Sequence, residues 1–426
     1  MVQEFINLDE IRKKYRRDGK CFVRTRKLSF GLLIIMILRK SMKSLQLILN
    51  ELADELGIGS ISNSAFTQRR ALLKHEFFIE LNQKTNVEVM YGDGDFKHYK
   101  GMRVLGIDGS KVRLPETEEI KNEFGEIEYR NGEENIKGKH NYGLASVMYD
   151  VLNKIAVDSY LGKAKDYEVN LALKHLEHTH ENDLLICDRN YPSYRWLSSI
   201  EQIGRKFVVR CSEASYKQAR TMLKGLGEDS QLTTLKPSYE KSSEINRLKL
   251  PKRLAVRFVR IPLNNGKYEV LVTNLLDEQL YPIEDFKELY HLRWGCETFY
   301  GILKTRLNLE NFSGKTVESI YQDFYSTVFL TGFESILTED SNVELTKRET
   351  KYPQQVNHAV SFNAIKNHAF ELLYGEKDTD ILLDKLEKLF LTNPTRYRLN
   401  KPSPPRKNSS SKSLLNYFKR LRKVCF

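Results

Sequence analysis

The sequence has no long apolar run and little cysteine. Its longest apolar stretch, over 32–38, has seven residues, whereas a transmembrane helix needs about 20. The N-terminal residues also lack the apolar stretch of a secretory signal. The five cysteines include no closely spaced pair of the kind that binds zinc, and they do not suggest a disulfide framework. These absences predict a cytoplasmic protein without a membrane span.

Acidic residues are absent from the C-terminal end and scarce at the N-terminal end. The chain has 68 Lys and Arg against 56 Asp and Glu, a formal net charge of +12. Residues 1–50 carry +8 and residues 393–426 carry +10, which leaves −6 for the residues between them. Basic ends predict a polyanionic partner such as DNA. The final basic segment, LNYFKRLRK, is predicted to contact DNA or, alternatively, to serve in solubility or dimerisation.

Hydrophobic periodicity divides the chain into five segments. We predict a helical DNA-binding region over 1–95 and an α/β core over 100–211 that resumes over 285–345. A β-rich insertion over 212–284 separates the two parts of the core, and a helical region with the basic tail occupies 346–426.

A helix-turn-helix is one interpretation of the N-terminal region. Two helical patterns are joined by a Gly- and Ser-rich turn over 57–64, and three polar residues stand early in the second: Gln68, Arg69 and Arg70. A helix with these side chains exposed would suit DNA recognition. The alternative is a helical bundle with a solvated basic face.

Two aspartates come directly after short apolar strands of the core. Asp108 follows RVLGI and Asp188 follows DLLIC. The carboxyl ends of strands in open α/β sheets are where ligands gather, and a carboxylate buried there needs a neutralising partner. The alternative for each aspartate is a turn or a helix cap.

A third carboxylate falls in a helix predicted from about residue 283 to residue 309. Four residues share one polar stripe of this helix: Tyr290, Arg293, Glu297 and Lys304. The stripe is either a functional face or a set of solvated pairs worth only about 0.3–0.5 kcal/mol each. Together with Asp108 and Asp188, Glu297 offers the hard oxygen ligands that Mg²⁺ or Mn²⁺ prefers.

The order and spacing of these residues resemble those of DDE transposases of the insertion-sequence-four family in bacteria. The family signature Tyr-x2-Arg-x3-Glu-x6-Lys is unbroken over 290–304, and the blocks Asp-Arg-x-Tyr and Asp-Gly-Ser occur at 188–191 and 108–110. The stretch SNSAFTQRRALL over 62–73 is similar to part of the family's DNA-binding region.

The resemblance implies an RNase H-like core that nicks DNA at transposon ends and transfers the strands into target DNA. It implies two Mg²⁺ or Mn²⁺ ions per active site, with Asp108, Asp188 and Glu297 as catalytic residues and metal ligands. DNA contacts would come from Tyr290, Arg293, Lys304, Arg189, Gln68, Arg69 and Arg70. The partners would be double-stranded DNA, with terminal inverted repeats and a target, and a second copy of the chain. The bound protein would be associated with the bacterial nucleoid.

One feature of the family is missing. Some relatives stack a flipped base on an aromatic residue, often a tryptophan of the insertion, but Trp196 and Trp294 both lie outside 212–284. A stacking platform would have to come from Tyr239, Phe258 or Tyr268. The motifs also leave two other functions open, namely a metal-dependent nuclease of the same fold and a domesticated DNA-binding protein.

Overall fold

A computed structural model describes residues 1–24, 27–130, 137–375 and 379–397. The chain folds into two compact units. We call the first the helical unit, made of Met1–Asp93, Val112–Gly143 and Gly301–Phe426, and the second the sheet unit, made of Gly94–Lys111 and Leu144–Tyr300. Within the described ranges, we found no helix that combines the length and hydropathy needed to cross a bilayer.

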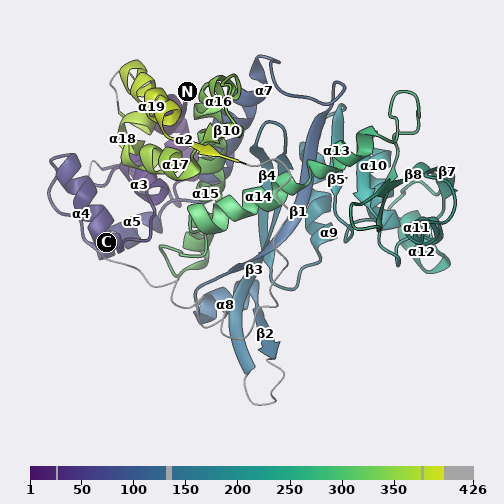
Figure 1. The fold of residues 1–426 in the computed structure, drawn as a ribbon. Coiled ribbons are helices and arrows are strands. Elements are labelled where there is room, and N and C mark those ends of the chain that lie inside the picture. The colour runs from purple at the N-terminus through teal and green to yellow at the C-terminus, as the bar shows by residue number, and fades with distance from the viewer. Residues whose placement is uncertain (25–26, 131–136, 376–378, 398–426) are drawn as a thin grey trace. The chain divides into compact units, whose positions relative to one another are not determined.

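The helical unit is built around α15 (Val317–Leu337), the longest helix described, which packs against α3, α6, α8, α16 and α17 (Figure 1). Its N-terminal elements are α1 (Val2–Asn7), α2 (Asp9–Tyr15), α3 (Phe30–Leu38), α4 (Leu45–Glu55), α5 (Asn63–Arg70), α6 (Glu76–Asn82), the π-helix η1 (Gln83–Val87) and α7 (Glu88–Gly92). Its later elements are α8 (Glu118–Phe124), β2 (Glu126–Arg130), the π-helix η3 (Ile302–Arg306), α16 (Glu339–Thr346), β10 (Gln354–Val356), α17 (His358–Asn367), α18 (Ala369–Leu373), α19 (Asp380–Thr392) and β11 (Pro394–Arg396). The basic tail predicted to contact DNA lies almost wholly outside the described residues.

The Gly- and Ser-rich turn joins α4 and α5, but each of the two predicted helices is broken: the first forms α3 and α4, and the second forms α5 and α6. Gly57, with a φ of 62°, follows the end of α4 in the left-handed conformation that glycine adopts easily. The hydroxyl of Ser62 then accepts the N–H of Ala65 and caps the start of α5. The two helices pack against each other.

The sheet unit holds the large mixed sheet. Its strands are β1 (Arg103–Arg113), β3 (Lys137–Asp150), β4 (Ile155–Lys163), β5 (Asp183–Cys187), β6 (Lys206–Arg210), β7 (Ser230–Leu235), β8 (Leu254–Pro262) and β9 (Tyr268–Thr273), with the ends of β1 and β3 belonging to the helical unit. The strand order is β3-β1-β5-β6-β9-β8-β7, and β4 also pairs with β3. Its helices are α9 (Glu168–His175), the 3₁₀-helix η2 (Leu176–His178), α10 (Tyr194–Gln202), α11 (Lys217–Leu223), α12 (Tyr239–Arg247), α13 (Asp285–His291) and α14 (Trp294–Gly301). The predicted α/β class is confirmed.

The strands of segment 212–284 extend this sheet. β9 pairs antiparallel with β6, with Val208 opposite Thr273, and β8 and β7 follow outward. The hairpin between β8 and β9 turns at Gly266, whose φ of 73° suits an Asn-Gly turn. The segment predicted as an insertion therefore adds strands to the sheet that carries Asp108 and Asp188.

The helix predicted over 283–309 is not continuous. α13 ends at His291, α14 begins at Trp294, and the π-helix η3 follows from Ile302. At the first break the chain tightens, because the N–H of Gly295 donates to the carbonyl of Leu292, three residues back. The prediction of a single helical stripe is wrong, because a helical wheel assumes 3.6 residues per turn throughout.

Candidate active site

Asp108 and Asp188 follow paired positions of two neighbouring parallel strands. β1 and β5 pair in a register that places Ile107 opposite Cys187, so each aspartate is the next residue after the last pair. Because matching positions of two paired parallel strands are neighbours, the register brings together two acids that are distant in sequence. The sequence correctly predicted Asp188 as a strand end. The prediction that a strand ends at Asp108 is wrong, since β1 continues to Arg113 after its pairing with β5 has stopped.

Glu297 is carried to this edge by α14. Gly106 of β1 lets the helix approach closely, because a Cβ at that position would be 2.3 Å from the sulfur of Cys296. Three residues after Glu297, the hydroxyl of Tyr300 donates a 3.0 Å hydrogen bond to the carbonyl oxygen of Asp108. The helix that carries the third predicted carboxylate is therefore fixed directly on the strand that carries the first.

Arg293 lies between the first and third predicted carboxylates. Its Nη2 donates a 2.8 Å hydrogen bond to Oε1 of Glu297, and its Nη1 lies 3.8 Å from Oδ2 of Asp108. Burial by itself would lower the pKa of Arg293, but the bond to Glu297 and the surrounding negative charge raise it above its ordinary value. In this arrangement Arg293 serves as the counter-ion of the acidic residues.

The carboxyl of Asp108 is poised to hold a proton near neutral pH. Burial raises its pKa to about 7, and the negative charge of Asp188 acts in the same direction. The charge of Arg293 and an N–H bond from Gly109, at 2.9 Å, oppose the shift without cancelling it. A carboxyl in such surroundings favours a further cation, which would stabilise its ionised form.

The three predicted metal ligands do not all lie within reach of one ion in this arrangement. Over the described part of the chain, the group of three or more potential ligands whose atoms all lie within 4.8 Å of one another is His75, Glu76 and Glu318. The cation between Asp108 and Glu297 is instead the guanidinium of Arg293. The donor set of Asp108, Asp188 and Glu297 still suits Mg²⁺ or Mn²⁺, because these ions prefer carboxylate oxygens as ligands. The Glu297 side chain is 40% exposed.

Tyr290 lies beside Arg293 but on the other side of the break in the predicted helix. Its ring centroid is 5.9 Å from the guanidinium carbon, and burial raises the pKa of its hydroxyl. The Tyr290 hydroxyl and the Arg293 Nε are both buried without a hydrogen-bond partner among the described residues. Buried polar atoms are rarely left unsatisfied, so this pair is a candidate contact for a ligand.

The two remaining basic residues near the signature lie elsewhere. Lys304 belongs to η3 of the helical unit, where its Nζ is 3.9 Å from Oε1 of Glu310. Burial lowers the pKa of Lys304, and the charge of Glu310 partly opposes this. Arg189 is exposed, immediately after Asp188.

The predicted DNA contacts of α5 divide into exposed and internal residues. Gln68 is exposed, and its amide donates to the hydroxyl of Ser64. Arg69 is half-buried, with its guanidinium 4.1 Å above the ring of Phe22. Gln68 and Arg69 line one surface pocket, so both remain predicted contacts.

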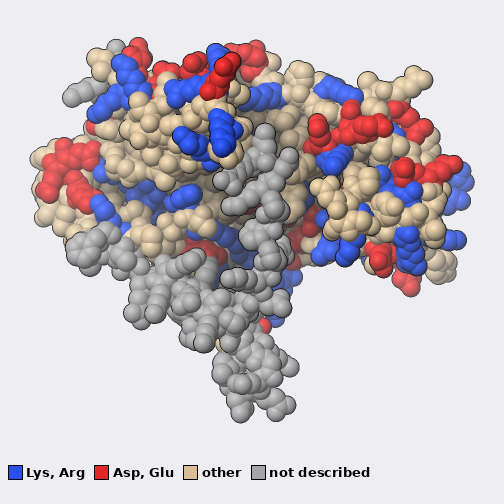
Figure 2. Space-filling model, in the orientation of Figure 1, with Lys and Arg blue, Asp and Glu red and all other residues tan. Residues whose placement is uncertain are grey.

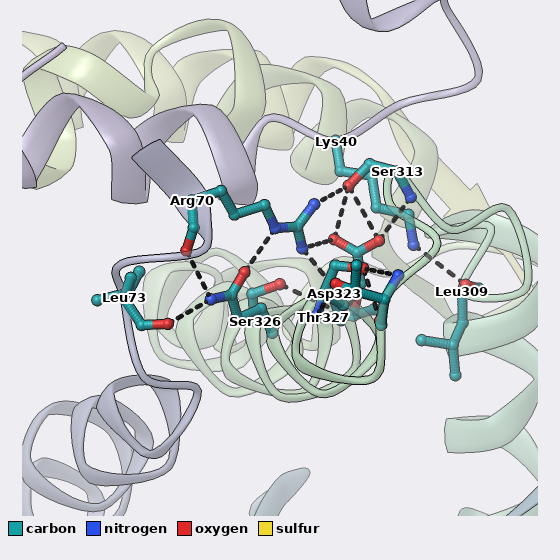
Figure 3. Close-up of polar contacts among 11 residues, drawn as sticks. Lys40, Arg70, Leu73, Leu309, Ser313, Asp323, Ser326 and Thr327 are labelled. Carbon is teal, nitrogen blue, oxygen red and sulfur yellow. Dashed lines mark hydrogen bonds and ion pairs between the residues drawn. The ribbon is translucent and has the colours of Figure 1, made fainter. Parts of the chain in front are cut away.

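Arg70 is not at the surface. Figure 3 shows its guanidinium pointing into a polar cluster centred on Asp323, at a distance of 2.7 Å. It also donates to Gln322 at 2.5 Å, to Ser313 at 2.6 Å and to the carbonyl of Ser319 at 2.9 Å. This correction follows from tertiary packing, since α5 turns Arg70 toward α15. Arg70 is only 3% exposed and donates to four acceptors that fix α5 on α15 and its preceding loop. Few of its N–H groups are therefore available to bind a phosphate.

Charge is mixed over the face of the molecule drawn in Figure 2, where Lys and Arg alternate with Asp and Glu. No single-sign field is seen on the described atoms of that face. The strong basic excess of the sequence falls largely on 398–426, outside the described residues.

Two residues near the site, Glu168 and Tyr191, were not predicted from the sequence. Glu168 opens α9, and its side chain packs on Gly109. Tyr191 is fully buried, with a hydroxyl that has no partner in the described structure. Tyr191 stands in the Asp-Arg-x-Tyr block, which was a usable signal, whereas a glutamate at the start of a helix is too common to be one.

Comparison with known proteins agrees with this architecture. Residues 99–331, more than half of the chain, match the family described as transposase DDE domain. The chain is 24% identical over 269 residues to transposase InsG for insertion sequence element IS4 of Escherichia coli (strain K12). That match covers 61% of this chain and 58% of InsG, so the chain spans less than two thirds of that relative.

A solved structure, that of the piggyBac transposase synaptic complex with hairpin DNA, is similar at a TM-score of 0.45 and 11% identity. The match covers 97% of this chain and 88% of that one, but it is too weak to argue from. The family match and the InsG relative confirm the resemblance expected from the motifs. The chain belongs to the DDE transposases, in the family of insertion sequence element IS4.

Proposed function

We propose that the protein is a DNA transposase that nicks DNA at transposon ends and transfers the ends into target DNA. The observation that carries the proposal is the parallel register of β1 and β5, which places Asp108 beside Asp188 while α14 brings Glu297 to the same edge. We further propose that the sheet around β1, β5 and β6 is an RNase H-like core, and that segment 212–284 is its insertion.

Asp108, Asp188 and Glu297 are the residues that would hold two divalent cations. When bound, such ions activate a water or a 3′-hydroxyl and stabilise the leaving oxygen. The chain's own residues prepare the site. Arg293 neutralises Asp108 and Glu297 before catalysis, and the proton held by Asp108 must leave before its carboxylate can take part.

The DNA contacts are proposed from exposure and unsatisfied polar atoms. The hydroxyl of Tyr290 and the Nε of Arg293 are buried without partners in the described residues, and a phosphate would satisfy both. Arg189 and Gln68 are exposed. Lys304 would add a contact from η3. The partners would be transposon ends, target DNA and a second copy of the chain, bound at the bacterial nucleoid.

Glu297→Gln tests the assignment. The variant should bind end-containing DNA as the wild type does, because the change is isosteric and removes a repulsive charge. It should lose Mg²⁺-dependent nicking by at least about 10³-fold, the scale set by removing one group of a preorganised site. Glu288→Gln, at an exposed glutamate of α13, is the control. Nicking by Glu297→Gln at the wild-type rate would remove Glu297 from the active site.

Joining distinguishes a transposase from a nuclease of the same fold. Purified protein, Mg²⁺, a labelled end fragment and a supercoiled plasmid should yield label covalently attached to the plasmid. Nicked end fragments without joined product would favour the nuclease. Binding without nicking would favour a domesticated DNA-binding protein. Inverted repeats bracketed by a short duplication around the coding region would support transposition independently.

A further inference from the structure

Glu168 contacts residues next to both aspartates of the proposed metal site, and it has no role in the proposed function. Its Cγ, Cδ and Oε1 are 3.0–3.2 Å from the point that a Cβ on Gly109 would occupy, so the carboxyl packs on the residue after Asp108. Its Oε2 accepts a 3.4 Å hydrogen bond from Nδ2 of Asn190, two residues after Asp188. Glu168 therefore contacts the neighbours of both aspartates.

The three carboxyls also act on one another electrostatically. Burial raises the pKa of Glu168, the hydrogen bond from Asn190 opposes this, and the charge of Asp188 adds to the rise. The charge of Glu168 in turn contributes to the raised pKa of Asp108. Negative groups gathered at one sheet edge repel each other unless a cation lies among them.

The helix that begins with Glu168 is firmly attached to the sheet. His175, at the other end of α9, lies 2.6 Å through Nδ1 from Oδ2 of Asp158 on β4 and 3.0 Å through Nε2 from Oγ of Ser146 on β3. All three residues are buried, so this Ser-His-Asp set has no access to a substrate. Its effect is to fix α9, and with it the position of the Glu168 carboxyl.

A buried hydroxyl without a partner lies in the same neighbourhood. Tyr191 is fully buried, and its Oη has no hydrogen-bond partner in the described residues. Burial raises its pKa, and the charges of Glu168 and Asp108 raise it further. A donor of this kind, enclosed next to carboxyls, is suited to a cation-bound water or to the carboxylates that surround a cation.

We propose that Glu168 is a further carboxylate of the metal site, binding a divalent cation together with Asp108 and Asp188. The proposal rests on the proposed function, because the ion is the one that the transposase would use. The ligand atoms of these three carboxyls do not form a group within 4.8 Å of one another among the described residues, so the proposal predicts that their side chains close around the cation when it binds. In the proposed site, the Tyr191 hydroxyl would donate a hydrogen bond that orients a carboxylate or a bound water.

A purely structural role for Glu168 makes a different prediction. An acid in the first turn of a helix stabilises it through the helix dipole, and the bond to Asn190 adds a local contact. Both effects change the unfolding of the protein and neither depends on Mn²⁺. Metal affinity measured on the folded, full-length chain therefore separates the two roles.

The experiment is a Mn²⁺ titration of the full-length protein without DNA, in which the electron paramagnetic resonance signal reports free Mn²⁺. Glu168→Gln should weaken the tightest Mn²⁺ site about tenfold, and Glu168→Asp, which keeps the charge on a shorter side chain, should weaken it less. Glu177→Gln, at an exposed glutamate of η2, should bind Mn²⁺ as the wild type does. In the nicking assay, higher Mn²⁺ should restore the rate of Glu168→Gln.

Asp188→Asn separates failure of this inference from failure of the proposed function. If Asp188→Asn weakens Mn²⁺ binding and Glu168→Gln does not, the metal site stands and Glu168 is not part of it. If neither variant weakens binding, the metal site itself is wrong and the inference falls with it. If circular dichroism shows that Glu168→Gln is less folded than wild type, Glu168→Asp is compared with wild type instead. Equal Mn²⁺ affinities of Glu168→Asp and wild type would then overturn the proposal.

Discussion

Arg293 and Glu297 are joined by a 2.8 Å hydrogen bond between Nη2 and Oε1, across one turn at the start of α14. The same guanidinium faces Asp108 at 3.8 Å. The signature residues proposed to bind phosphate and metal therefore satisfy one another in the protein alone. DNA and metal must compete with this internal pairing, so substituting Arg293 should affect the binding of both.

Arg293→Ala should separate DNA binding from metal binding. Loss of a phosphate contact should weaken binding to end DNA and lower the slope of log affinity against log salt by about one unit. Loss of a competing cation should strengthen Mn²⁺ binding at least about fivefold, because like charges near a surface repel by roughly 1 kcal/mol or more. Filter binding over a salt series and Mn²⁺ titration measure the two effects. Arg348→Ala, at an exposed arginine of the helical unit, should change neither, and an unchanged salt slope for Arg293→Ala would make that residue structural only.

Lys304→Ala tests whether η3 contacts DNA. We expect the salt slope to fall by about one unit with little effect on Mn²⁺ binding, since a phosphate contact acts through counterion release. The exposed Lys347, paired with Glu344, supplies the control Lys347→Ala. Equal salt slopes for the two variants would indicate that Lys304 pairs with Glu310 and does not contact DNA.

Asp108 should make stability depend on pH in the metal-free protein. Its pKa is about 7 in the folded state against an ordinary 3.8, so between these values the folded state holds a proton that the unfolded chain has lost. The free energy of unfolding should therefore fall as the pH rises from about 4 to about 7.

Asp108→Asn removes this contribution. The variant should be more stable than wild type by about 2–4 kcal/mol at pH 8 and by less than about 1 kcal/mol at pH 4. Urea unfolding in the presence of EDTA measures both, with Asp54→Asn, at an exposed aspartate of α4, as control. A constant difference between the variant and wild type over this pH range would contradict the raised pKa.

Arg70→Ala should destabilise the protein rather than weaken DNA binding directly. Removing one partner of a buried pair leaves Asp323 as an uncompensated charge, which costs about 3–5 kcal/mol. Lys13→Ala breaks the exposed pair with Asp9 and should change the free energy of unfolding far less, because solvent screens an exposed pair. Chemical denaturation gives these values. If Arg70→Ala is as stable as wild type but lowers the salt slope of DNA binding by about one unit, Arg70 contacts DNA and the structural role is wrong.

Local patterns in the sequence were enough to locate the acidic residues. The apolar runs before Asp108 and Asp188 identify the buried, paired parts of β1 and β5, because a strand buried on both faces is uniformly apolar. The spacing from Tyr290 to Lys304 identified the family without any structure. These features depend on neighbours in the chain, which a sequence displays directly.

Tertiary structure decided which side chains face one another. Periodicity could not show that the chain breaks at Leu292 and Arg293, that Arg70 meets Asp323 on a helix far along the sequence, or that Glu168 packs on Gly109. The break is a local change of hydrogen bonding within one helical pattern, whereas the partners of Arg70 and Glu168 come from distant elements and are placed by how the apolar faces pack. The sequence by itself therefore determined the chemistry available to the protein, and the packing of its elements determined which groups act together, because burial and charge pairing are properties of three-dimensional neighbours.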